Sequence, residues 1–130
     1  MVTPLLQHIH VKYQNNLKIS IITATLNDFK TIEACVSSLV RQTYADIEHI
    51  VIDGGSTDGS QVFLEQYAKS QANVVYRSKP DLGIYHALNQ GVAMASGDII
   101  GYLHGDDLLS DTNIIEAVVN QFKLSNAFGV

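Results

Sequence analysis

The segment Ile99-Ile100-Gly101-Tyr102-Leu103-His104-Gly105-Asp106-Asp107 joins an apolar run to two adjacent carboxylates. The apolar part is short and carries isoleucine and tyrosine, which predicts a buried strand. Two neighbouring carboxylates at the end of such a strand are costly to keep charged unless a partner compensates them. A divalent cation with oxygen ligands is the usual partner, although turns after strands also favour aspartate for local hydrogen bonds. Alone, the pair leaves both interpretations open.

Strand and helix patterns alternate along the rest of the chain. Apolar runs predict strands over residues 19–22, 47–52, 74–76 and 99–103. Apolar residues at helical spacing predict helices within residues 32–40, 58–67, 84–95 and 111–122. Strand–helix units with short connections are typical of an α/β domain, in which a mostly parallel sheet has helices on both faces.

Two of the predicted helices have candidate caps. Asp58 and Gln61 have the spacing of a capping box, which predicts that a helix begins there. Ser110 or Asp111 is expected to cap the last helix. The residues of that helix expected to face the core are Ile115, Val118, Val119 and Phe122.

Polar residues gather directly after each predicted strand. These loops are Thr23–Asn27, Asp53–Asp58, Lys79–Gly83 and His104–Asp107. The carboxyl ends of parallel strands meet at one edge of the sheet, where α/β proteins bind their ligands. Four polar loops at one edge indicate a binding site more strongly than any one of them does.

Asp53 ends the second apolar run and precedes Gly54 and Gly55. Glycines let the backbone approach a ligand closely, so an acceptor here could bind a nucleobase or a ribose hydroxyl. Aspartates in such positions also accept the amides of their own turn, and the spacing does not separate the two interpretations. Asp58 is expected to act only as a helix cap. His49 alternates with buried neighbours, which predicts that its ring is satisfied inside the fold.

Composition narrows the class of protein. The chain has 130 residues, 46% of them apolar and 16% charged, enough for one domain with a core. Its formal net charge of −5 argues against nucleic acid or an anionic membrane surface as a partner. No apolar run reaches the roughly 20 residues of a membrane-spanning helix. Cys35 is the only cysteine and no signal-peptide pattern occurs, which predicts the cytoplasm.

Six segments occur in an order that resembles a known family, whereas the dinucleotide pattern G-x-G-x-x-G and the phosphate-loop pattern are absent. The segments are Ile19–Asn27, Ser38–Tyr44, Ile50–Gly59, Asp81–Gly91, Ala95–Asp98 and Gly105–Asp107. Together they resemble glycosyltransferase family 2. The resemblance implies a Rossmann-like GT-A fold, truncated relative to the family. Residues 1–17 would be a lead-in, and residues 18–130 the nucleotide-sugar-binding part.

The resemblance also implies roles for single residues. Those expected to bind the nucleotide sugar are Thr23, Ala24, Thr25, Asn27, Asp53, Asp81 and Asp106. Of these, Asp53 would hold the base, and Asp106 would contact the ribose or the sugar. Asp107 would ligate Mn²⁺ or Mg²⁺, a cation that bridges the diphosphate and stabilises the leaving nucleoside diphosphate.

Three positions depart from the family pattern. His104 stands where the family often has Asn or a small polar residue, and His86 stands where it often has Asp. Gly54 stands where a second Asp is common. These departures bear on the choice of donor more than on the fold.

The implied activity is metal-dependent, inverting transfer from a nucleoside-diphosphate sugar to a glycan or lipid-linked acceptor, in polysaccharide assembly. Inverting transfer needs a carboxylate base, which in the family lies beyond the part that this chain resembles. A non-catalytic nucleotide-binding fragment is therefore the alternative. A sugar-nucleotide pyrophosphorylase ranks low because Thr23–Asn27 lacks glycine and basic residues. We expect a cytoplasmic protein, at most peripheral to the inner face of the membrane, that self-associates through an open sheet edge.

Overall fold

The structure, a computed structural model, describes residues 17–80 and 83–127. In this part of the chain, parallel strands form one sheet in the order β3-β2-β1-β4. The strands are β1 (Ile19–Thr25), β2 (Ile47–Asp53), β3 (Val74–Ser78) and β4 (Ile99–Tyr102). The helices are α2 (Phe29–Val40), α3 (Ser60–Ser70), α4 (Ile84–Met94) and α5 (Ile114–Ala127). The predicted α/β architecture with a parallel sheet is confirmed.

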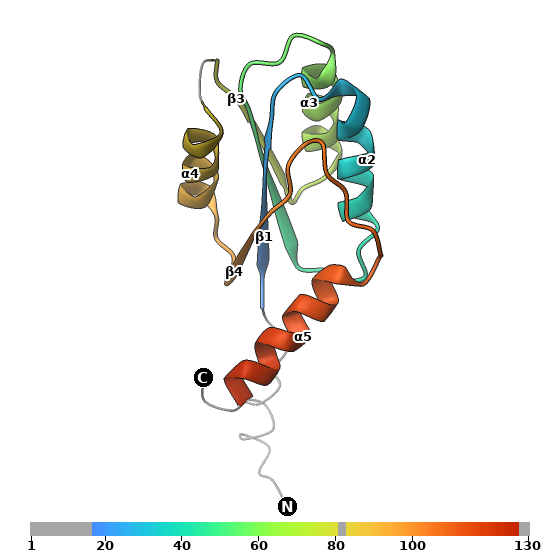
Figure 1. Ribbon diagram of the computed structural model, residues 1–130, viewed down its shortest axis with the longest axis vertical. Helices are drawn as coiled ribbons and strands as arrows, with labels where there is room; N and C mark the ends of the chain where they lie inside the picture. The colour runs from blue at the N-terminus through green and yellow to red at the C-terminus, as the bar shows by residue number, and fades with distance from the viewer. Residues whose placement is uncertain (1–16, 81–82, 128–130) are drawn as a thin grey trace, which may run out of the picture.

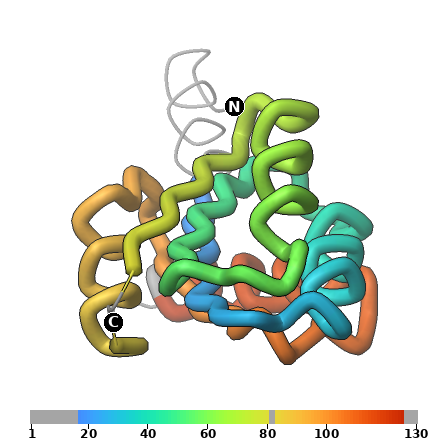
Figure 2. The backbone as a smooth tube through the Cα atoms, turned by 90° about the horizontal axis from the view of Figure 1, so that it is seen from above, coloured from blue at the N-terminus to red at the C-terminus, as the bar shows by residue number. Residues whose placement is uncertain are grey.

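Helices cover both faces of the sheet, as predicted. Figures 1 and 2 show α2 and α3 on one face and α4 on the other. The alternation of side chains along β1 explains the two layers, because Ile19 and Ile21 join the core on the α2 side, whereas Ile22 and Ala24 join the core under α4. No helix within the described ranges is both long and apolar enough to cross a membrane.

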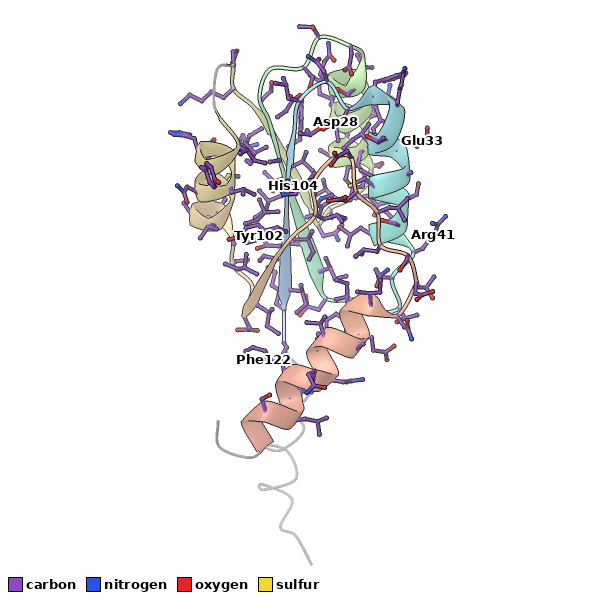
Figure 3. All side chains as sticks on the ribbon, viewed as in Figure 1. Asp28, Glu33, Arg41, Tyr102, His104 and Phe122 are labelled. Carbon is purple, nitrogen blue, oxygen red and sulfur yellow. The ribbon has the colours of Figure 1, made fainter. Side chains whose placement is uncertain are left out.

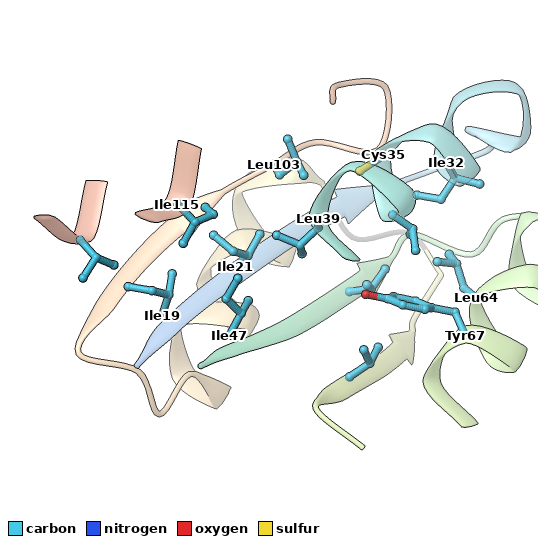
Figure 4. Packing of buried hydrophobic residues seen from close by; sticks show 14 residues of the cluster. Ile19, Ile21, Ile32, Cys35, Leu39, Ile47, Leu64, Tyr67, Leu103 and Ile115 are labelled. Atoms are coloured by element: carbon cyan, nitrogen blue, oxygen red, sulfur yellow. The ribbon is translucent and has the colours of Figure 1, made fainter. Parts of the chain in front are cut away.

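The larger core lies between the sheet and helices α2, α3 and α5 (Figure 4). Ile32 and Leu39 of α2 and Ile115 of α5 are buried in it. Burying an aliphatic side chain of this size contributes about 1.5–3 kcal/mol. Cys35 is also completely buried, and burial raises the pKa of its thiol to about 12, so the thiol stays protonated and inert.

The smaller core brings α4 directly onto β1 and β2. Ala87 of α4 packs with Ile22 and Ile50 of the sheet. Gly91 allows the helix to come close, because a Cβ at this position would lie 2.4 Å from Cγ2 of Ile22. This packing places the first residues of α4 at the carboxyl edge of the sheet.

The chain after β4 runs beside the end of β1. Pairing between the two strands continues past Tyr102, because the Leu103 N–H donates to the Ile22 carbonyl (3.0 Å) and the Gly105 N–H donates to the Ala24 carbonyl (3.2 Å). The polar segment that follows β4 is thereby carried to the same edge as the polar segment that follows β1.

At the opposite edge, Glu48 ties the connection between α4 and β4 to the sheet. Its carboxylate accepts hydrogen bonds from the Ser20 hydroxyl (2.5 Å) and the Ser96 N–H (2.6 Å), and Nζ of Lys18 lies 3.4 Å away. Burial opposes the charge, but these donors outweigh it and lower the pKa of Glu48 to about 2. The ionised Glu48 therefore anchors the chain just before β4.

Two predictions about the last helix are wrong. The helix α5 begins at Ile114, so neither Ser110 nor Asp111 caps it. Val118 and Phe122 are 47% and 44% exposed instead of facing the core. The reason is visible in Figure 1, where α5 runs past the lower end of the sheet, so that only part of one helix side has a surface to cover.

The predicted capping box forms only in part, although α3 does begin at the expected place: Oε1 of Gln61 accepts a hydrogen bond from the Gly59 N–H (3.0 Å), but Asp58 is not the N-cap. The N-cap residue of α3 is Gly59, which has no side chain to cap the helix. Asp58 accepts hydrogen bonds from the Ser60 N–H (3.0 Å) and from the Phe29 N–H (2.9 Å). Asp58 therefore joins the start of α3 to the start of α2.

Candidate functional site

A cavity of about 440 Å³ opens at the carboxyl edge of the sheet. It lies between the end of β1, the turn after β2, the segment after β4 and the start of α4. Its lining residues are Ala24, Thr25, Leu26, Asp28, Gly54, Gly83, Ile84, Ala87, His104, Gly105 and Asp106. The cavity thus brings together Ala24, Thr25 and Asp106, three of the residues predicted to bind a nucleotide sugar.

The two adjacent carboxylates after β4 are placed differently. Asp106 lines the cavity and also a neighbouring hollow of about 480 Å³ beside the start of α2. Asp107 is exposed and lines neither, while its N–H donates to the His104 carbonyl (3.0 Å). Asp106 is therefore the member of the pair on the cavity wall.

Asp28 is a site residue that sequence reasoning missed. It lies just before α2 and lines both the cavity and the neighbouring hollow, and Figure 3 labels it together with His104. Its Oδ2 accepts hydrogen bonds from Oγ1 of Thr25 (2.6 Å) and from the Leu26 N–H (3.2 Å). Its position directly after the polar loop that follows β1 was a signal, but only the tertiary structure places it beside the Asp106 turn.

Thr23 lies in the core and not among the residues that line the cavity. Its Oγ1 is 2.7 Å from Nε2 of His49, and Nδ1 of His49 is 2.8 Å from the Tyr67 hydroxyl. The alternation along β1 explains this placement, because Thr23 and Ala24 point to opposite faces of the sheet. The prediction that His49 is satisfied inside the fold is confirmed. Burial lowers the pKa of His49 to about 3, so the ring is neutral.

Asp53 is completely buried at the end of β2 and uses both carboxylate oxygens inside the fold. Oδ1 accepts hydrogen bonds from the Gly55 N–H (3.1 Å), the Ser56 N–H (2.9 Å) and the Ser56 hydroxyl (2.6 Å). Oδ2 accepts one from the Tyr76 hydroxyl (2.6 Å). These are the contacts of a turn aspartate, and the expectation that Asp53 holds a base stays a prediction.

Asn27 joins the loops that follow β1 and β2. Its N–H donates to the Ser56 hydroxyl (2.9 Å), and its Oδ1 accepts from the Thr57 N–H (2.8 Å). Asn27 lines the neighbouring hollow and not the main cavity. The remaining predicted site residue, Asp81, lies outside the described residues.

The carboxylates at this edge suit a hard cation. Mg²⁺ prefers oxygen ligands and is usually held by one or two carboxylates together with substrate phosphates and water, and Mn²⁺ also suits carboxylate ligands. Asp106 and Asp107 offer such oxygens, with Asp28 nearby. Within residues 17–80 and 83–127, no three His, Cys, Asp or Glu side chains are grouped so that they could hold a metal. Two carboxylates on one turn match the number of protein ligands that Mg²⁺ usually takes when phosphates and water supply the rest.

Comparison with known proteins places the chain in a family. Residues 20–128 match the family described as "Glycosyl transferase family 2". The chain belongs to glycosyl transferase family 2. The resemblance inferred from the order of the sequence segments is thereby confirmed.

Two curated relatives show how much of a family member the chain represents. It is 40% identical over 102 residues to an uncharacterized glycosyltransferase of Mycobacterium tuberculosis, which covers 78% of this chain and 38% of that protein. It is 33% identical over 110 residues to the cholesterol galactosyltransferase of Borreliella burgdorferi, which covers 85% of this chain and 30% of that protein. The chain therefore spans between 30% and 38% of the length of these two relatives.

Solved structures confirm the GT-A fold of this family 2 chain. S. aureus TarS matches with a TM-score of 0.73 at 23% identity, covering 80% of this chain and 19% of TarS. The mannosyltransferase PcManGT from Pyrobaculum calidifontis, in complex with GDP-Man and Mn²⁺, matches with a TM-score of 0.70 at 23% identity. The second match covers 92% of this chain and 39% of that enzyme.

Proposed function

We propose that residues 18–130 form the nucleotide-sugar-binding part of a metal-dependent, inverting glycosyltransferase. The observation that carries this proposal is the cavity of about 440 Å³ at the carboxyl edge, with Asp28 and Asp106 in its wall and the start of α4 beside them. Membership of glycosyl transferase family 2 supports the same class of reaction. It also favours a transferase over the pyrophosphorylase considered from the sequence.

The lining of the cavity suits the parts of a nucleoside-diphosphate sugar. Leu26 and Ile84 are 54% and 50% exposed and offer apolar surface to a base or a sugar ring. Gly83 and Ile84 begin α4, and a helix N-terminus carries partial positive charge that favours phosphate. Ala24 and Thr25 at the end of β1 would form the floor beneath the ligand.

The family resemblance assigned the cation to Asp107 and the ribose or sugar to Asp106; because Asp106 lines the cavity, we propose that both would hold Mn²⁺ or Mg²⁺ together with the diphosphate. When bound, such a cation neutralises the phosphates and stabilises the leaving nucleoside diphosphate. Without a cation, Asp28 and Asp106 would repel the phosphates, and the net charge of −5 would add to the repulsion. Asp106 is the better placed of the pair because it lines the cavity, whereas Asp107 lies beside it.

The choice of acceptor and the identity of the catalytic base are properties of the whole enzyme, and here we propose only the acceptor. We propose a glycan or lipid-linked acceptor, in polysaccharide or cell-envelope glycan assembly on the cytoplasmic side of the membrane. The name of one relative, cholesterol galactosyltransferase, supports a lipid as one kind of acceptor. A chain that binds nucleotide but transfers no sugar would instead support the non-catalytic alternative.

Isothermal titration of the chain with UDP and GDP tests the binding function. These ligands are chosen because structural neighbours are complexes with UDP and with GDP-Man. We expect at least one of them to bind about tenfold more tightly with Mn²⁺ or Mg²⁺ than in excess EDTA, since a cation relieves a repulsion worth about 1 kcal/mol or more. Equal nucleotide affinity with the cation and in excess EDTA would refute the proposal of metal-dependent binding. Incubation with UDP- and GDP-sugars and acceptors then separates transfer from binding alone.

A further inference from the structure

The turn that carries Asp106 is held on both sides of Gly105. The Gly105 N–H donates to the Ala24 carbonyl (3.2 Å), and the Thr31 hydroxyl donates to the Gly105 carbonyl (2.9 Å). Ala24 belongs to β1, and Thr31 lies near the start of α2. Two elements that are distant from Gly105 in sequence therefore fix the peptide groups directly before Asp106.

The Thr31 hydroxyl has one proton and two neighbouring acceptors. The Gly105 carbonyl lies 2.9 Å away and the Asp28 carbonyl 3.2 Å away. The Asp28 carbonyl already accepts the N–H groups of Thr31 (2.9 Å) and Ile32 (2.8 Å). Among the described residues, the Thr31 hydroxyl is the group that donates a hydrogen bond to the Gly105 carbonyl. Removing the hydroxyl would therefore cost this carbonyl its partner.

The backbone at Gly105 also lies very close to the side chains of Thr25 and Asp28. A Cβ at this position would lie 2.5 Å from Oδ2 of Asp28 and 2.5 Å from Oγ1 of Thr25, closer than real contacts allow. Those two atoms are themselves hydrogen-bonded at 2.6 Å. Gly105 therefore packs closely against the Thr25–Asp28 pair, and the Thr31 hydroxyl ties the turn to α2.

We propose that Thr31 is a positioning residue for Asp106: by holding the Gly105 carbonyl, its hydroxyl keeps the Asp106 carboxylate on the cavity wall. This inference rests on the proposed function, in which that carboxylate helps to bind a cation and a diphosphate. Thr31 lines the neighbouring hollow beside Asp106 but not the main cavity, so it acts on a ligand in the main cavity through the turn. A turn released from α2 would lose the fixed direction of its carboxylate.

Three substitutions test the role of the hydroxyl. Thr31→Val keeps the shape and removes the hydrogen bond, whereas Thr31→Ser keeps the hydroxyl. Thr43→Val is the matched control, because the Thr43 hydroxyl bonds Glu116 (2.8 Å), beyond the other end of α2. Gly105→Ala is a second perturbation at the same place, since its Cβ would meet Oδ2 of Asp28 and Oγ1 of Thr25, so that the turn or these side chains must shift while the Thr31 hydroxyl is kept.

Two measurements are made on each variant, with thermal unfolding to show that it folds. The first is amide hydrogen exchange of Gly105 and Asp107. The second is the ratio of the nucleotide dissociation constants in EDTA and in Mn²⁺, with whichever of UDP or GDP the wild type binds. For Thr31→Val and Gly105→Ala, we expect exchange to rise and the ratio to fall by about fivefold, the size expected for one hydrogen bond. Thr31→Ser and Thr43→Val should keep the wild-type values.

The remaining outcomes contradict either the positioning role of Thr31 or the proposed function. Unchanged exchange in Thr31→Val, or faster exchange with an unchanged metal ratio, would contradict the positioning role while the wild type still binds nucleotide. A wild type without any metal-dependent binding would contradict the proposed function, and the positioning role would fall with it.

Discussion

The hydroxyl of Tyr76 donates a hydrogen bond of 2.6 Å to Oδ2 of Asp53. Tyr76 lies on the edge strand β3, and Asp53 ends the adjacent strand β2. Burial, the hydrogen bond to Asp53 and the charge of Asp53 raise the pKa of Tyr76, so the phenol keeps its proton and stays a donor. The pair fixes the carboxylate for which the sequence left two roles open.

Asp53→Ala separates those two roles. The amides of Gly55 and Ser56 and the hydroxyl of Tyr76 would lose their acceptor, so we expect a loss of about 1–3 kcal/mol in the free energy of unfolding, measured in urea. If Asp53 also holds the base, the affinity for the nucleotide falls by a similar amount. Asp46→Ala, at an exposed aspartate, is the control. Unchanged affinity with a lower urea midpoint would refute the base-binding role.

Metal dependence is expected to reside in the adjacent carboxylates after β4. Asp106→Ala and Asp107→Ala should each reduce the gain in nucleotide affinity on adding Mn²⁺ by about tenfold, because each removes a charged ligand of a cation held partly by phosphate. Titration with and without EDTA measures this gain. Asp111→Ala, an exposed aspartate outside the cavity lining, should keep it. Loss in one variant alone would identify the ligand, and retention in both would refute the assignment.

The buried His49 predicts a stability change in mild acid. Burial lowers the pKa of His49 to about 3 in the folded chain, against 6.5 for a free histidine. The unfolded chain therefore takes up the proton first, and stability falls as the pH drops from about 6.5 toward 3. Urea unfolding at a series of pH values measures this loss, which His49→Gln should reduce and His86→Gln should keep. An NMR titration of the His49 ring with a midpoint near 6.5 would contradict the burial.

Self-association is expected at the β4 edge. In the described part of the chain, β4 pairs with β1 alone, and apolar side chains are exposed on β4 and on α5: Ile100, Tyr102, Val118 and Phe122. Unpaired strand edges with apolar surface favour association. We expect sedimentation equilibrium of the chain to give a mass above the monomer. Tyr102→Lys should shift it toward the monomer, and Tyr85→Lys on α4 should not. A strictly monomeric wild type would refute this expectation.

The sheet and the edge that carries the site could be predicted from local patterns. The apolar runs that became β1, β2 and β4 were found because buried strands need few polar residues, and the loops after them were polar because they face solvent or ligand. The register was not available, since the pairing of Ile22 with Tyr102 joins residues far apart in sequence. The exposure of Val118 and Phe122 could not be predicted for a related reason. The spacing of apolar residues shows which side of a helix is apolar, but it does not show how much of the sheet that side covers.

The sequence by itself determined the family, the α/β class and the presence of a carboxylate-bearing turn after the fourth strand, because these follow from short-range patterns and from the order of motifs. Only the tertiary structure decided that Asp106, and not Asp107, lines the cavity and that Thr23 turns inward to His49. It also brought Asp28 and Thr31 to Gly105. The physical reason is that side-chain direction at a strand end depends on pairing and packing with distant segments, which no local pattern records.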